Sequence, residues 1–245
     1  MSKYLFSIVL SLFSLPTQAH RPHAVAKAYA NSIEFESSGV AWAVMDPHDV
    51  SQLMRSDDFG QHWDYVYSPA TDDSLVDAED SSVGLLLLGK DGTVWQQNDT
   101  GIWLEYNGLE NGVIAREFEV IGGRLYIATS NGLYHALVSD LSSFSQMGIE
   151  SNLISVHTDG DGLGAILAVD AEGAVWRAEG PGTTFDLLSP LPGGRKALSI
   201  TEQNGRIIAG TNLLTMVSDD DGATWVTCGT MPISNGNDYV THIVE

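Results

Sequence analysis

Several side-chain patterns in this sequence are of types that can carry chemistry. Asp159-Gly160-Asp161-Gly162 begins like a calcium-binding loop but lacks a third acidic ligand and a closing Glu, so a turn is the better interpretation. Carboxylates are abundant, and a pair of them about 5 to 10 Å apart is what glycoside hydrolysis requires. His-x-x-x-His, Cys-x-x-Cys, phosphate-loop and nucleophile-elbow motifs are missing. The patterns specify no reaction, and we predict no metal site and no cofactor.

The net charge of the chain limits the classes of partner that it can bind. The 245 residues contain 11 Lys and Arg against 32 Asp and Glu, a formal charge of -21 at pH 7. Such a chain repels polyanions, so we expect no nucleic acid partner and no anionic membrane surface. Cations, basic proteins and neutral glycans are compatible with this charge, although solubility alone is the simpler explanation of the acidity.

The first residues have the order of a secretory signal peptide. Lys3 precedes an uncharged apolar run from Tyr4 to Leu15, and Pro16-Thr17-Gln18-Ala19 follows as a small-residue cleavage site. The run is shorter than the roughly 20 residues that span a bilayer, which argues against the alternative of a membrane anchor. We therefore predict a signal peptide over residues 1–19 and an exported protein, periplasmic or extracellular, without membrane insertion.

After cleavage, residues 20–30 would form a flexible tail that begins with His20-Arg21-Pro22-His23. An N-terminal His can chelate copper through its amine and ring, but a disordered tail is the better interpretation. Cys228 is the single cysteine, so no intramolecular disulfide can form and stability must come from packing. We predict that Cys228 is a buried, inert thiol.

An aromatic residue recurs along the chain at nearly constant spacing. Trp63, Trp103, Phe144, Phe185 and Trp225 are 40, 41, 41 and 40 residues apart. A glycine recurs with them, at positions 39, 84, 123, 164 and 205, and each one precedes a short apolar run of β-forming residues. Such a period indicates five repeated structural units.

Each unit divides into four short β segments. In the first unit they are Ile33 to Phe35, Val40 to Val44, Gln52 to Ser56 and Trp63 to Tyr67, separated by turns, and the later units repeat the order. Four meandering strands per period predict an all-β fold, a β-propeller of four-stranded antiparallel blades, rather than a sandwich. A β-solenoid is the alternative, but its coils have shorter periods and lack hairpins.

Two hairpins share the pattern Ser-x-Asp-x-Gly-x-x-Trp, and the other three units keep only parts of it. The complete matches are Ser56, Asp58, Gly60 and Trp63 in the first unit and Ser218, Asp220, Gly222 and Trp225 in the fifth. Ser and Asp side chains can bond the backbone N–H groups of the turn, Gly supplies the permissive dihedral, and Trp buries a large face. The pattern resembles the Asp-box, or bacterial neuraminidase (BNR) repeat. It is found in propellers of the sialidase superfamily, sortilin-type ectodomains, xyloglucan-acting glycosidases and photosystem II assembly-factor-like proteins.

The resemblance implies which segment of each unit is the innermost strand and which is the outermost. In these families the Asp-box lies between the third and fourth strands, at the periphery. We therefore expect these eight residues to be structural rather than catalytic. The propeller is expected over residues 31–245, with blades at about 31–68, 74–106, 115–147, 153–188 and 197–228 and a partial blade at 238–245. Tyr239 to Val244 would be the first strand of a sixth blade. The chain is then either part of a larger propeller or a five-blade ring with an additional strand.

The resemblance also implies where a ligand would bind. In these propellers the ligand face consists of the loops between blades and the loops between second and third strands. The candidate residues on it are Asp46, His48, Asp49, Asp72, Asp73, Glu110, Arg116, Arg195 and Lys196. Most of these charges are also explained as solvated loop residues.

We expect a non-catalytic propeller that binds a protein or a glycan through this face. The alternative is a glycoside hydrolase, either sialidase-like or xyloglucan-active. A sialidase needs an arginine cluster, whereas Arg124 and Arg206 fall on the opposite rim; a neutral-glycan hydrolase needs a carboxylate pair such as Asp72 with Glu110. A scaffold role like that of the photosystem-associated proteins is a third possibility, but the acidic balance predicts no basic docking patch.

Overall fold

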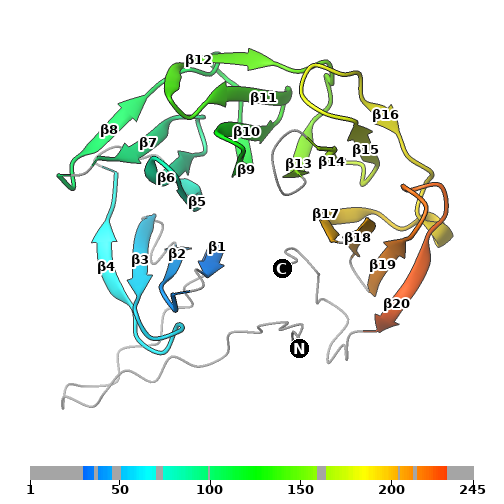
Figure 1. Cartoon of the computed structure of the whole chain (residues 1–245), viewed down its shortest axis with the longest axis horizontal. Coiled ribbons are helices and arrows are strands. Elements are labelled where there is room, and N and C mark those ends of the chain that lie inside the picture. The colour runs from blue at the N-terminus through cyan, green and yellow to red at the C-terminus, as the bar shows by residue number, and fades with distance from the viewer. Residues whose placement is uncertain are drawn as a thin grey trace.

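The structure is a computed structural model that describes residues 30–35, 38–45, 51–69, 74–98, 100–158, 164–203, 205–211 and 214–230. In these ranges, twenty strands form five four-stranded antiparallel sheets, and the helical content is one 3₁₀ turn, η2 (Pro192–Gly194). Figure 1 shows the sheets arranged in an arc around a common centre, with the first strand of each sheet innermost. The prediction of an all-β propeller with five four-stranded blades is confirmed.

Each blade consists of four consecutive strands, from the centre outward. The first blade contains β1 (Ala30–Phe35), β2 (Ala41–Met45), β3 (Gln52–Ser56) and β4 (Asp64–Tyr67). The second contains β5 (Leu75–Ser81), β6 (Gly84–Gly89), β7 (Val94–Gln97) and β8 (Trp103–Tyr106). The third contains β9 (Ala115–Ile121), β10 (Arg124–Thr129), β11 (Gly132–Leu137) and β12 (Asp140–Gln146). The fourth contains β13 (Leu153–Thr158), β14 (Ile166–Asp170), β15 (Val175–Ala178) and β16 (Asp186–Leu187), and the fifth contains β17 (Ala197–Gln203), β18 (Arg206–Thr211), β19 (Leu214–Ser218) and β20 (Val226–Thr230).

The second strand of a blade is buried on both faces. In β10, Leu125, Tyr126, Ile127 and Ala128 are all 0% exposed. Consecutive rather than alternate residues are apolar because neighbouring blades cover both faces of the sheet. Four apolar clusters result, one between each successive pair of blades. The short unbroken apolar runs in the sequence therefore mark the strands that hold the blades together.

In the second and fifth blades, the recurring aromatic residue packs against the preceding blade. Trp103 of the second blade stacks on Tyr67 of β4, with ring centroids 4.7 Å apart. Trp225 of the fifth blade is 6% exposed and donates its indole N–H to the carbonyl oxygen of Ser189, at 2.9 Å. The constant spacing of these rings follows from the repetition of one inter-blade contact.

Several sequence predictions concern residues outside the described ranges. These are the signal peptide over 1–19, the tail up to Tyr29, the calcium-like loop at 159–162 and the strand from Tyr239 to Val244. They stay predictions. Within the described ranges, no helix has the length and apolar character needed to cross a membrane.

The prediction of a buried Cys228 is wrong, because this thiol is exposed. Cys228 lies on β20, the outermost strand of its blade, and its neighbours Val226 and Thr227 are exposed as well. An outermost strand has no further strand beyond it, so apolar residues there are not covered as they are in the second strands.

Candidate binding face

One end of the propeller carries the connections between blades. In a four-stranded meander, the loops that join blades and the turns that join second to third strands lie at the same end of the strands. This end is termed the loop face. The turns between first and second strands and between third and fourth strands lie at the opposite end.

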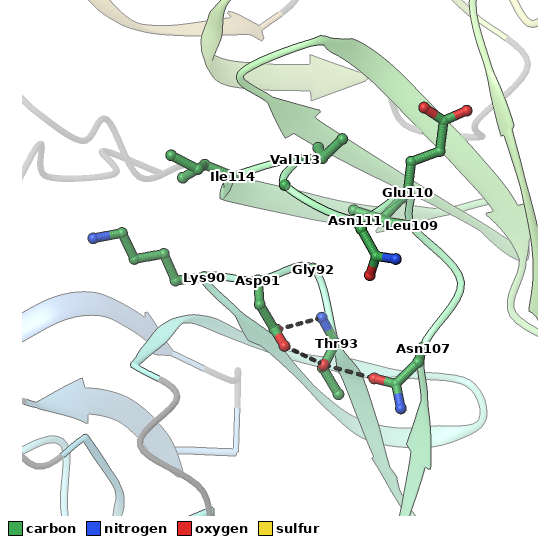
Figure 2. Close-up of a pocket in the computed structure, with 11 residues that line it drawn as sticks. Lys90, Asp91, Gly92, Thr93, Asn107, Leu109, Glu110, Asn111, Val113 and Ile114 are labelled. Carbon is green, nitrogen blue, oxygen red and sulfur yellow. Dashed lines mark hydrogen bonds between the residues drawn. The ribbon is translucent and has the colours of Figure 1, made fainter.

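A pocket of about 360 Å³ opens on the loop face between the second and third blades. One wall is the turn from Lys90 to Thr93 between β6 and β7, and the other is the loop from Asn107 to Ile114 that joins β8 to β9. Figure 2 shows the side chain of Asn111 directed toward the turn, whereas Lys90 and Ile114 extend to the side of the view away from Glu110. The pocket thus combines charged, amide and apolar groups.

A short polar network holds the walls of the pocket in place. The backbone N–H of Thr93 donates to Oδ1 of Asp91 at 2.8 Å, and the Thr93 hydroxyl lies 2.9 Å from Oδ2 of Asp91 and 2.7 Å from Oδ1 of Asn107. The N–H of Ala115 donates to the carbonyl oxygen of Lys90 at 2.9 Å, which ties one wall to the other. The two loops therefore form a fixed surface.

Basic side chains lie at three successive seams between blades on the loop face. Lys90 is at the seam between the second and third blades. Arg116 on β9 crosses the next seam and donates to Oδ1 of Asn152 at 3.1 Å. At the seam between the fourth and fifth blades, Lys196 pairs with Oε2 of Glu172 at 2.9 Å. Together with the residue that precedes Lys196, these bases are termed the basic arc: Lys90, Arg116, Arg195 and Lys196.

The sequence-predicted ligand-face residues fall into two groups. Glu110 lines the pocket, and Arg116, Arg195 and Lys196 belong to the basic arc. The others lie outside the described residues, and their role stays a prediction: Asp46, His48, Asp49, Asp72 and Asp73.

Sequence reasoning missed Lys90 and Asn111 as candidate residues. Lys90 follows the second strand of its blade, which is the position that Asp46 holds in the first blade. The sequence-predicted set includes the loop after the second strand only in the first unit. Applying the repeat to every unit would have identified Lys90.

A second set of polar side chains lies deeper, along the innermost strands. Inner strands of adjacent blades do not pair as β-ladders, so their inward N–H groups need other acceptors. Carboxylates of the preceding blade supply them. The bonds, at 2.6 to 3.1 Å, run from the N–H of Asp80 to Glu34, of Phe118 to Asp77, of Val120 to Glu79, of Val156 to Glu117 and of Thr158 to Glu119.

The environment of three acids on the innermost strands, Asp77, Glu79 and Glu117, favours their neutral form. Burial raises the pKa of Asp77 to about 6. Burial, with the nearby charge of Asp77, raises the pKa of Glu117 to about 8, and burial raises that of Glu79 well above its usual value. In the fourth blade, Nδ1 of His157 lies 3.3 Å from Oε1 of Glu119. The sequence contained a signal that was missed, since Asp-x-Glu and Glu-x-Glu occur at the same place in consecutive repeats. No group of three or more His, Cys, Asp or Glu side chains in the described ranges is arranged to hold a metal ion.

The two Ser-x-Asp-x-Gly-x-x-Trp turns share a set of hydrogen bonds made by Ser and Asp. In each, the Ser hydroxyl donates to Oδ1 of the Asp at 2.9 Å and accepts the N–H of the Gly at 2.8 Å. Oδ1 of the Asp also accepts a backbone N–H at 2.8 Å, from His62 in the first turn and Thr224 in the second. Hydrogen bonding, first from the His62 side chain, lowers the pKa of Asp58 to about 2. Both turns join third to fourth strands, away from the loop face.

Comparison with known proteins shows the fold. No protein-family model matches the sequence, and no curated protein matches it. The chain is similar to YCF48 bound to D1 peptide, with 16% identity and a TM-score of 0.63 over 85% of this chain and 70% of that one. It is also similar to a catalytically inactive virginiamycin B lyase from Staphylococcus aureus with quinupristin, with 12% identity and a TM-score of 0.69 over 88% of this chain and 74% of that one. A third similar structure is YCF48 from Cyanidioschyzon merolae, with 13% identity and a TM-score of 0.61 over 84% of this chain and 86% of that one. At these identities the similarity establishes a β-propeller and no more.

Proposed function

We propose that this chain is an exported, non-catalytic propeller that binds a segment of another protein through its loop face. The pocket between the second and third blades carries the proposal, because a concavity with apolar surface and a few placed polar groups is the usual form of a binding site. The carboxamide of Asn111 can both donate to and accept from a peptide backbone, and the 39% exposed Ile114 supplies apolar contact. A similar propeller, YCF48, has been solved with a bound peptide, which supports the proposal by analogy of fold.

The composition of the pocket favours binding over glycoside hydrolysis. Hydrolysis requires two carboxylates that face one cleft. Of the two exposed acids that line the pocket, Asp91 accepts hydrogen bonds from Thr93 with both carboxylate oxygens, which leaves Glu110 as the acid outside this network. The lining residues also include no aromatic ring on which a sugar could stack, so we favour a protein ligand over a glycan.

Export and the Asp-box assignment are part of this proposal. Lys3 followed by the apolar run from Tyr4 to Leu15 supports export. The Ser-to-Asp and Gly-to-Ser hydrogen bonds that the two Ser-x-Asp turns share support the Asp-box assignment. N-terminal sequencing of protein recovered from the periplasm or medium should begin at His20. A product that keeps Met1 and stays in the cytoplasm would contradict export.

Selection of peptide ligands tests the binding proposal. Short random peptides displayed on phage are selected against the full chain, and the affinities of the selected peptides are measured. Asn111→Trp fills the pocket from an exposed position and should weaken binding by about tenfold or more. Gln61→Trp, exposed at the opposite end of the propeller, is the matched control and should bind as the unchanged chain does. Equal binding by both variants, or no selected peptide, would refute the proposal.

A further inference from the structure

The basic side chains of the described chain differ in how they are paired. Toward the end opposite the loop face, three of the four described arginines pair with carboxylates: Arg55 with Asp57, Arg177 with Glu179 and Asp221, and Arg206 with Asp219. The fourth, Arg124, lies 3.4 Å from Nδ1 of His135. In the basic arc, Lys196 pairs with Glu172. For the other three members, Lys90, Arg116 and Arg195, the described residues supply no carboxylate partner.

This difference is unexpected in a chain of charge -21, where acids outnumber bases almost threefold. An exposed ion pair stabilises a fold by little, because solvent screens it and both side chains lose freedom. Leaving Lys90 and Arg116 without a carboxylate partner therefore costs the fold little. Their charge stays available to a partner, in which complementary groups set specificity and the rate of association.

The basic arc follows the inner margin of the loop face across three seams. The carbonyl oxygen of Lys90 accepts the N–H of Ala115 at the first seam, and Arg116 bonds Asn152 at the second. At the third, Lys196 packs against the turn before β15, where a Cβ added at Gly173 would overlap the Lys196 Cβ. The arc begins at the pocket, because Lys90 is one of its lining residues. A partner that contacts all of these bases must extend across several blades.

We propose that the loop face selects an extended, acidic segment of its partner protein, with carboxylates over the basic arc and one residue in the pocket. This inference rests on the proposed function and names its partner class. It departs from the expectation that the acidic balance leaves no basic docking patch, because the loop face holds four of the eight described bases and three of those four have no carboxylate partner in the described residues. A long polyanion such as nucleic acid would meet the repulsion of the whole chain, whereas a short segment can place its few carboxylates over the basic arc.

The test uses the peptides selected on the full chain, and the inference predicts that Asp and Glu are enriched in them. Lys90→Gln/Arg116→Gln should weaken their binding about fivefold to tenfold at low salt. Arg55→Gln/Arg206→Gln removes the same charge from exposed arginines away from the loop face and should change affinity less than about twofold. Unfolding midpoints of both variants verify folding. For the unchanged chain, affinity should fall as salt is raised.

The outcomes separate this inference from the proposed function. Peptides that lose binding on Asn111→Trp but are neutral or basic would overturn the acidic partner and leave loop-face binding intact. An equal loss of peptide affinity in the Lys90→Gln/Arg116→Gln and Arg55→Gln/Arg206→Gln variants would also overturn it. The absence of any peptide that binds at the loop face would overturn both proposals. If a sulfated oligosaccharide bound more tightly than the selected peptides and responded to the same variants, an acidic protein would be the wrong partner class.

Discussion

The carboxylate of Glu117 accepts a 2.9 Å hydrogen bond from the backbone N–H of Val156, across the seam between the third and fourth blades. The N–H of Phe118 makes the same kind of bond to Asp77 at the preceding seam, at 3.1 Å. Because the inner strands of adjacent blades do not pair, these bonds satisfy N–H groups that have no strand partner. Three of the acids that make these inter-blade bonds, Asp77, Glu79 and Glu117, are also acids whose pKa is raised by burial.

Stability should therefore fall as the pH rises through the neutral range. The pKa of Glu117 is about 8 in the folded chain against an ordinary value of 4.5, and that of Asp77 is about 6 against 3.8. The folded chain thus binds these protons more tightly than the unfolded chain, and ionising them costs folding free energy. The free energy of unfolding should be highest near about pH 4 to 5 and decline toward about pH 8. Urea unfolding midpoints measured across this range give the slope.

Glu117→Gln should flatten this decline, because the amide oxygen still accepts a hydrogen bond but cannot ionise. We expect the loss of stability between about pH 4.5 and 8 to shrink by on the order of 2 kcal/mol. Glu150→Gln removes the same charge from an exposed loop residue and should leave the slope unchanged. A Glu117→Gln profile as steep as that of the unchanged chain would show that this acid is ionised throughout.

Ser218→Ala should destabilise the fifth blade. The Ser218 side chain is 1% exposed, and its hydroxyl accepts the N–H of Gly222 at 2.8 Å while it donates to Asp220. Alanine leaves a buried N–H without an acceptor, which costs about 1–3 kcal/mol. The change is measured as a shift in urea midpoint. Ser218→Thr, which keeps the hydroxyl, should lose less, and equal losses would assign the effect to packing instead.

The regular features of the sequence predicted the fold because they record contacts that every blade repeats. From the second unit on, the aromatic marks a contact with the preceding blade, as Trp103 on Tyr67 does. The unbroken apolar run around Ile127 marks a strand covered on both faces. Both signals recur in successive units of the same chain. They can therefore be identified by comparing the units with one another, without a second sequence.

The binding face was less predictable because its features depend on which side chains meet across blades. Arg116 was a candidate from its place in a loop, but its bond to Asn152 joins residues 36 positions apart and has no sequence pattern. The absence of an ion partner for Lys90 among the described residues likewise follows from three-dimensional placement. Charge counts alone gave the opposite expectation, since they describe the average surface and not one face of it.

Cys228 should react in the folded protein. The thiol is exposed on β20, so a thiol reagent reaches it without unfolding the chain. Titration under native conditions should give one reactive thiol per chain, at a rate that denaturant changes little. A thiol that reacts only in denaturant would mean that β20 is covered in solution, for example by a second copy of the chain.

Two glycines separate the effect of crowding from that of backbone strain. Gly101 has φ +80° and Gly132 has φ +118°, so alanine is strained at both. A Cβ at Gly101 would have no atom within 4 Å, whereas one at Gly132 would overlap the carbonyl oxygen of Ile149. Gly101→Ala should therefore cost about 1–2 kcal/mol from the dihedral alone. Gly132→Ala should cost at least about 1 kcal/mol more, because the backbone of the loop between the third and fourth blades must move. Equal shifts in urea midpoint would mean that this loop moves at little energetic cost. The contact between the third and fourth blades at this loop would then contribute little to stability.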